Sequence, residues 1–90
     1  MTIRRWVVHG AVQGVGFRYF AKRRAERLGL SGWARNVRDG SVEVVVEGPD
    51  DALHALHEAL LQGPVAADVV RVDEHQVPAE VQMPVGFEVR

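Results

Sequence analysis

The dipeptide Asp39-Gly40 lies between two runs in which apolar and polar residues alternate. Asp-Gly favours the tight turn of a β-hairpin, because such turns need residues that tolerate a positive φ. We therefore expect residues 30–37 and 41–48 to form two antiparallel strands joined by this turn. Alternation in the second strand predicts that its valines share one face and its glutamates the other. These side chains are Val42, Val44 and Val46 on one face and Glu43 and Glu47 on the other.

In the rest of the chain, segments with the residue pattern of strands alternate with segments whose apolar residues have helical spacing. A run rich in β-branched and aromatic residues predicts a strand over residues 5–12, and we expect two further strands over residues 65–77 and 87–90. Apolar residues three and four apart predict two helices, over residues 17–28 and about 50–62. An aspartate, Asp50 or Asp51, is the expected N-cap of the second helix. The order βαββαβ predicts an α+β fold, a two-layer ferredoxin-like sandwich with a mostly antiparallel sheet and two helices on one face.

The composition limits the function classes that fit this chain. Its 90 residues suit one domain with a modest core, so we expect a single domain over residues 1–90. The net charge of −1 gives no support for nucleic-acid binding. No apolar run approaches the roughly 20 residues of a membrane span, no signal segment precedes the first strand, and cysteine is absent. We expect a cytoplasmic protein that binds neither nucleic acid nor membrane.

Glycines at positions 10, 14 and 16 mark the connection from the first strand into the first helix. Glycine lets successive main-chain N–H groups point toward one anion at a helix N-terminus, and Arg18 would add a planar, permanent charge. The expected occupant is a phosphate or a carboxylate. The segment lacks the ending of a P-loop and the third glycine of a dinucleotide fingerprint. A plain strand-to-helix turn would also need glycines, so this reading stays open from the loop alone.

Asn36 ends the first hairpin strand, after Gly32-Trp33-Ala34-Arg35. A central hairpin can bring the end of this strand beside the glycine loop. The asparagine amide offers both a donor and an acceptor, which suits it to hold and orient a water molecule. An asparagine before Asp-Gly is also a common turn residue, so the structural alternative stands beside the functional one.

Together these two segments resemble the acylphosphatase family over nearly the whole chain. The matching residues are Gly10–Arg18, Gly32–Asn36, Gly40, Val42, Gly48-Pro49 and Phe87–Arg90. The resemblance implies a hydrolase that splits the carboxyl-phosphate bond of acyl phosphates into a carboxylate and inorganic phosphate, with no metal and no cofactor. We expect a monomer that takes a small acyl phosphate and is inhibited by inorganic phosphate. The alternative is a non-catalytic regulatory module of the same fold that binds phosphate or carbamoyl phosphate.

The resemblance also assigns roles within the site. Arg18 would bind the phosphate and Asn36 would position the attacking water, so these two are the predicted catalytic residues. Main-chain N–H groups would cradle the phosphoryl oxygens along a loop of six residues, Gln13, Gly14, Val15, Gly16, Phe17 and Arg18. In some relatives the chain terminus pairs with the arginine, which predicts a contact between Arg90 and Arg18. Ala11 and Val37 depart from the arginine and threonine that many members carry.

Other residues with functional chemistry have simpler interpretations. His54 and His57 lie three apart on the second helix, and we expect a solvated helix face rather than a metal site. We expect His9 on the outer face of the sheet and Trp33 in the core or packed on a loop. The basic residues Lys22–Arg24 and Arg27 are expected to form a charged outer helix face.

Overall fold

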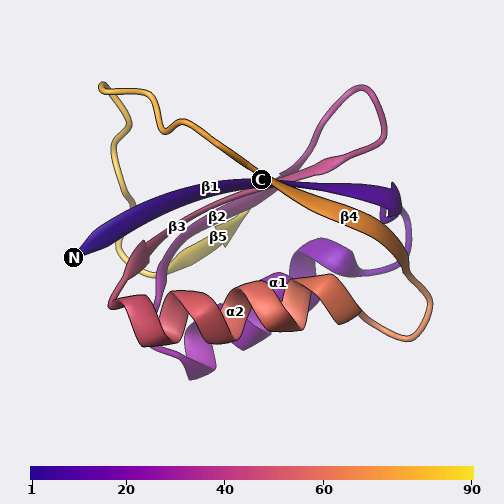
Figure 1. Cartoon of the computed structure of the whole chain (residues 1–90), viewed down its shortest axis with the longest axis horizontal. Coiled ribbons are helices and arrows are strands. Elements are labelled where there is room, and N and C mark those ends of the chain that lie inside the picture. Colours follow the sequence, from indigo (N-terminus) through magenta and orange to yellow (C-terminus); the bar gives the residue numbers. More distant parts are fainter.

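The computed structural model describes residues 1–90 and contains five strands and two helices. In chain order they are β1 (Thr2–Ala11), α1 (Phe17–Arg27), β2 (Ser31–Asn36), β3 (Val42–Gly48), α2 (Asp50–Gln62), β4 (Asp68–His75) and β5 (Phe87–Val89). Both helices cover the same face of one sheet (Figure 1). Neither has the length and hydrophobicity needed to cross a membrane. The predicted two-layer α+β architecture is confirmed.

The strand order β4-β1-β3-β2-β5 brings three strand ends to one edge of the sheet. β3 pairs antiparallel with both β1 and β2, so β1 and β2 run in the same direction. β5 pairs parallel with β2 and therefore shares that direction, whereas β4 pairs antiparallel with β1. The carboxyl ends of β1, β2 and β5 consequently lie at one edge, where the loop that leads into α1 also lies.

The apolar core fills the space between the sheet and the two helices. Alternation along β3 points the predicted valines into this core, and all of them are fully buried: Val42, Val44 and Val46. The helices contribute residues three and four apart, namely Phe17, Ala21 and Ala25 from α1 and Leu53, Leu56 and Leu60 from α2. Burial of each large side chain contributes about 1.5–3 kcal/mol. The buried ring of Phe17 anchors the first residue of α1, immediately before Arg18.

The start of α2 differs from the prediction. Pro49 is the N-cap, with φ −70° and ψ 153°, and it makes no side-chain capping hydrogen bond, while Asp51 Oδ1 accepts from the Ala52 N–H in the first turn at 2.9 Å. The predicted aspartate N-cap is wrong because Asp50 and Asp51 already lie in the first turn, where carboxylates interact favourably with the helix dipole. β4 also begins later than predicted, because a turn closed by the Ala67 N–H and the Pro64 carbonyl precedes it.

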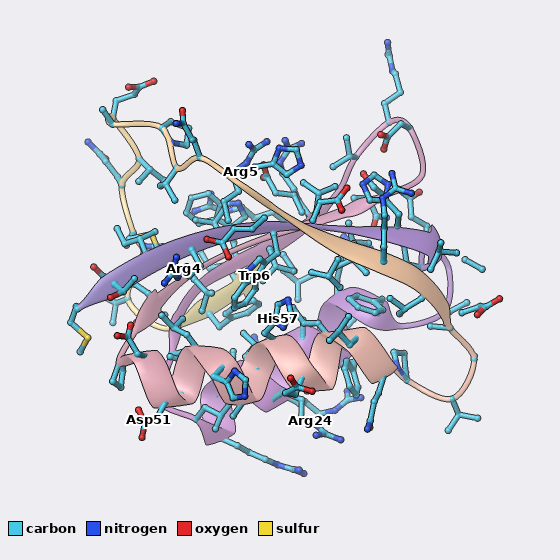
Figure 2. The ribbon with its side chains drawn as sticks, viewed as in Figure 1. Arg4, Arg5, Trp6, Arg24, Asp51 and His57 are labelled. Carbon is cyan, nitrogen blue, oxygen red and sulfur yellow. The ribbon has the colours of Figure 1, made fainter.

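Side chains of β1 alternate between the two faces of the sheet, as Figure 2 shows for Arg5 and Trp6. Trp6 points toward α2 and is buried, whereas Arg5 points away from the helices. On this open face Arg5 and Arg35 each donate from Nε to the carboxylate of Glu43, at 2.7 and 2.6 Å. Burial raises the pKa of Glu43, but the hydrogen bonds from Arg35 and Arg5 outweigh it and hold the pKa below its ordinary 4.5. Glu43 therefore lies on the predicted face as a buried, doubly paired carboxylate.

Candidate active site

The loop between β1 and α1 turns through two glycines in the left-handed region. Gly14 and Gly16 have φ values of 74° and 77°, and a Cβ at either position would meet no atom within 4 Å. Side chains are therefore disfavoured here by the backbone conformation and not by crowding. Gly10 has a different purpose from the one predicted. It lies within β1 at an irregularity in the pairing with β4, where a Cβ would collide with the main-chain oxygen of Asp68.

The main-chain N–H groups of this loop are free of backbone partners. None between Gln13 and Tyr19 donates to a main-chain oxygen, and the hydrogen bonds of α1 begin with the Phe20 N–H and the Gly16 carbonyl at 3.0 Å. No side chain caps α1, and its first turn carries no acidic residue. A run of free N–H donors at a helix N-terminus attracts an anion.

Arg18 and Asn36, the two predicted catalytic residues, line the same cavity, about 190 Å³ in volume. The other lining residues are Val12, Gly14, Gly16, Phe17 and Tyr19. No acidic side chain is among them, so the guanidinium gives the cavity a positive charge. Tyr19 is 57% exposed, and no sequence pattern marked it as part of the site.

Two of the predicted loop residues do not line this cavity. Val15 is half-buried and packs against the apolar core. The Gln13 side chain reaches the β2–β3 hairpin instead, where its Nε2 donates to the carbonyl oxygens of Val37 at 2.7 Å and Ser41 at 2.9 Å. The contribution of these two residues to an anion cradle is therefore limited to their main-chain N–H groups, and it stays a prediction.

The Arg18 guanidinium is oriented by the end of β5. Its Nη1 donates to the main-chain oxygen of Arg90 at 2.8 Å, so the expected contact between these residues is present. The Arg90 N–H in turn donates to the Ala34 carbonyl at 2.8 Å. The Arg90 guanidinium lies over the Trp33 ring, 4.1 Å from its centroid. Trp33 is thus buried beneath Arg90 and is not part of the core against the helices.

Side chains alternate between the two faces along β2, and this alternation points Asn36 toward the cavity. Ala34 is fully buried under the helices, so Asn36, two residues later, points to the same face of the sheet. It lies opposite Val42 and is the last residue of its strand. Beyond it the hairpin turn is fixed by Asp39, whose Oδ1 accepts from the Ser41 hydroxyl at 2.6 Å and the Ser41 N–H at 2.9 Å. These two hydrogen bonds hold the pKa of Asp39 below its ordinary value.

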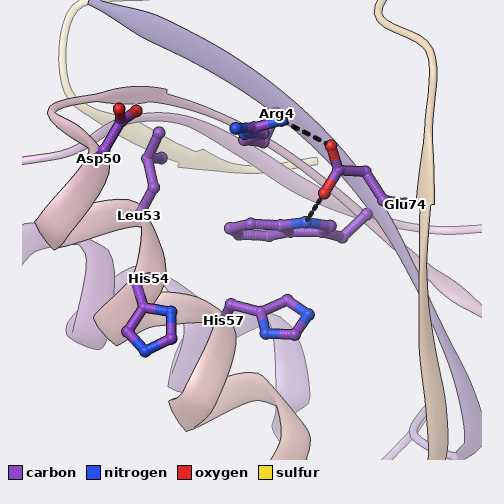
Figure 3. A pocket seen from close by; sticks show the side chains of 7 residues that line it. Arg4, Asp50, Leu53, His54, His57 and Glu74 are labelled. Atoms are coloured by element: carbon purple, nitrogen blue, oxygen red, sulfur yellow. Dashed lines mark hydrogen bonds and ion pairs between the residues drawn. The ribbon is translucent and has the colours of Figure 1, made fainter.

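A second hollow, of about 250 Å³, lies between α2 and strands β1 and β4 (Figure 3). Two of its lining residues pair with Glu74: Arg4 Nη1 lies 2.8 Å from Glu74 Oε2, and the Trp6 indole donates to Glu74 Oε1 at 3.4 Å. His54 is exposed, as predicted. The prediction is wrong for His57, because its ring packs against Trp6 with 5.2 Å between centroids and is half-buried.

The remaining basic side chains lie outside the cavity. His9 is on the open face of the sheet, as predicted, with Nε2 3.3 Å from Asp73 Oδ2. Arg23 and Arg24 are exposed on α1, and the Arg24 guanidinium lies 5.0 Å from the centroid of the Phe20 ring. Arg23, Arg24 and Arg27 thus form the predicted charged outer face of α1, whereas Lys22 is half-buried.

Comparison with known proteins shows the family of this chain. The sequence model of the family described as Acylphosphatase matches residues 4–89. The chain is 54% identical over 86 residues to an acylphosphatase of Alkalilimnicola ehrlichii, which covers 96% of this chain and 94% of that relative. An acylphosphatase structure from Coxiella burnetii has a TM-score of 0.87 at 38% identity, over 99% of this chain and 92% of that one. The acylphosphatase structure from Bacillus subtilis has a TM-score of 0.84 at 37% identity, over 100% and 99% of the two chains.

Proposed function

Because this chain belongs to the acylphosphatase family and hydrolyses acyl phosphates, we propose that Arg18 and the loop amides bind the phosphoryl group while Asn36 orients the attacking water. The observation that carries this proposal is the shared cavity, which Arg18 and Asn36 line from α1 and β2 together with the loop glycines.

Arg18 and the loop suit the electrostatic demands of phosphoryl transfer. Negative charge lies on the three phosphoryl oxygens as the bond to the leaving group breaks, and preorganised donors stabilise it. The guanidinium offers a fork of N–H donors, and the free N–H groups at the start of α1 offer more. The hydrogen bond to Arg90 fixes one side of the guanidinium, so less reorganisation is needed when substrate binds.

Asn36 suits the placement of the nucleophile. In the reaction a water oxygen forms a bond to phosphorus while the bond between phosphorus and the acyl oxygen breaks. The carboxylate leaves as a stable anion and needs no proton. No aspartate, glutamate or histidine lines the cavity, so the water's proton passes to a phosphoryl oxygen of the substrate. The Asn36 carbonyl oxygen accepts a hydrogen bond from the water and holds it in line with the departing carboxylate.

Hydrolysis of benzoyl phosphate in the presence of a chelator tests these roles. We expect Arg18→Ala and Asn36→Ala each to lower kcat by about 10²–10³-fold. Only Arg18→Ala should weaken competitive inhibition by inorganic phosphate, because Asn36 acts on the water. Circular dichroism verifies that each variant is folded. Near-parental turnover by a folded variant contradicts the role given to that residue, and phosphate binding without turnover by the parent indicates the regulatory binding module instead.

We also propose that the protein acts as a cytoplasmic monomer on a small acyl phosphate and is inhibited by its product, inorganic phosphate. The proposed roles of Arg18, Asn36 and the loop glycines are filled by residues of one chain and need no second copy. The near-neutral charge supports a small-molecule substrate over a nucleic acid. Light scattering after size exclusion tests the monomer, and cell fractionation tests the location.

A further inference from the structure

We propose that Gln13 is a positioning residue for hydrolysis, because its side chain joins the anion loop to the hairpin that carries Asn36. Its Nε2 donates to the carbonyl oxygens of Val37 at 2.7 Å and Ser41 at 2.9 Å. An amide nitrogen carries two hydrogens, so both donors of this side chain are used on the hairpin. The inference rests on the role proposed above for Asn36.

The two acceptors belong to the last paired residues before the hairpin turn. The Val37 N–H donates to the Ser41 carbonyl at 2.8 Å, so these residues face each other across the hairpin. Val37 follows Asn36 directly, and the carbonyl that Gln13 binds belongs to the next peptide group, between Val37 and Arg38. Because one side chain of the loop binds both the Val37 and the Ser41 carbonyl, it fixes the position of Asn36 relative to the loop.

The sheet itself does not make this connection. The pairing of β1 with β3 ends at Val8 and Val42, and beyond this point β1 pairs only with β4. Asn36 lies opposite Val42, at the place where this ladder ends. Past Val8, β1 thus stays paired with β4 but is no longer paired with the β2–β3 hairpin. The Gln13 side chain bridges the loop after β1 and this hairpin.

Gln13 is not placed to bind phosphate through its side chain. It is absent from the residues that line the cavity of Arg18 and Asn36. Its influence on the reaction must then pass through Asn36 and affect turnover more than phosphate binding. A displacement of about 1 Å of a positioning group costs up to about 10²-fold in rate.

Two variants of Gln13 test the inference. Gln13→Met keeps the length of the side chain and removes both N–H donors. Gln13→Glu keeps the shape of the side chain but replaces the donating amide nitrogen with a carboxylate oxygen, which repels the carbonyl oxygens of Val37 and Ser41. We expect kcat for benzoyl phosphate to fall about 10–100-fold in each, while the inhibition constant of inorganic phosphate changes less than about twofold. Gln62→Met, the same substitution at an exposed position at the end of α2, is the matched control and should retain parental kcat.

The double variant shows whether Gln13 acts through Asn36. In an Asn36→Ala background, Gln13→Met should lower kcat less than about twofold further, because there is no amide left to position. Nuclear magnetic resonance of the parent and Gln13→Met gives a readout apart from activity. The Asn36 side-chain amide and the Val37 and Ser41 resonances should shift or broaden, and those of Gly16 and Arg18, which are not sequence neighbours of Gln13, should stay.

Three results overturn the inference: parental kcat in folded Gln13→Met, fully additive losses in the double variant, or a phosphate inhibition constant that rises in parallel with the loss of kcat. The last would mean that Gln13 shapes the anion loop itself. Failure of the proposed function is distinct, because Asn36→Ala alone would then retain activity whatever Gln13 does.

Discussion

Arg18 Nη1 donates a hydrogen bond to the main-chain oxygen of Arg90 at 2.8 Å, although 72 residues separate the two along the chain. Arg90 is itself held by the Ala34 carbonyl and by the Trp33 ring. The orientation of the phosphate-binding guanidinium therefore depends on β5, the shortest strand of the sheet.

Removal of Arg90 should lower kcat/KM for benzoyl phosphate by about tenfold, because a hydrogen bond to a charged group is worth about 1.5–3 kcal/mol and solvent replaces part of it. Inhibition by inorganic phosphate should weaken to a similar degree. Arg90→Ala keeps the main-chain oxygen and loses the stacking on Trp33 and the ion pair with Glu88, neither of which contacts Arg18, so its loss of kcat/KM should be much smaller. Equal losses in the two variants would show that the Arg90 side chain, and not its main-chain oxygen, matters.

Gly16→Ala should lower both stability and turnover. An alanine at φ 77° costs roughly 1–2 kcal/mol, and relaxation of the loop would move the N–H donors that face the cavity. Gly29→Ala is the matched control, since Gly29 has φ 71° in open space after α1. Urea unfolding should show similar destabilisation in both variants, with a fall in kcat of about tenfold or more in Gly16→Ala alone. A parallel loss of kcat in Gly29→Ala would contradict the role of the loop.

The buried carboxylate of Glu43 should make stability depend on pH in the acid range. Its pKa in the folded protein lies below the ordinary 4.5, so its stabilising contribution is present above pH 4.5 and is lost as the pH falls through the lowered pKa. Glu43→Gln should reduce the free energy of unfolding near pH 7 by about 1–2 kcal/mol, allowing for the solvent around Arg35. Urea unfolding near pH 2.5 should show a much smaller difference. The same difference at both pH values would exclude an ionic origin.

The two helix histidines should differ in their effect on stability and agree in their lack of effect on hydrolysis. His57→Ala removes the packing against Trp6 and should lower the free energy of unfolding by about 1 kcal/mol. His54→Ala removes an exposed ring and should change it by less than about 0.5 kcal/mol. Both should retain kcat within about twofold, since neither lines the cavity of Arg18 and Asn36. A larger loss of turnover in either variant would implicate the hollow beside α2 in the reaction.

Much of the fold was predictable because its signals are local. Alternation along β3 predicted its buried face, Asp39-Gly40 predicted the hairpin, and spacing of three and four predicted the buried stripes of both helices. Each of these patterns depends on residues that lie only a few positions apart in the sequence. The N-cap of α2 was not predictable in this way. Pro49 and the two aspartates after it all suit a helix start, and the packing of the whole helix decides which residue is first.

The sequence by itself determined the glycine loop, the arginine that follows it and the asparagine at the end of the hairpin strand. The tertiary structure brings Arg18 and Asn36 to one cavity and Arg90 to Arg18, which the sequence indicated only through the family resemblance. They meet because β1, β2 and β5 run in the same direction and end at one edge of the sheet. That arrangement depends on which strands pair across the fold, and no short-range spacing encodes it. The same long-range pairing leaves a gap between the loop and the hairpin, which the Gln13 side chain spans.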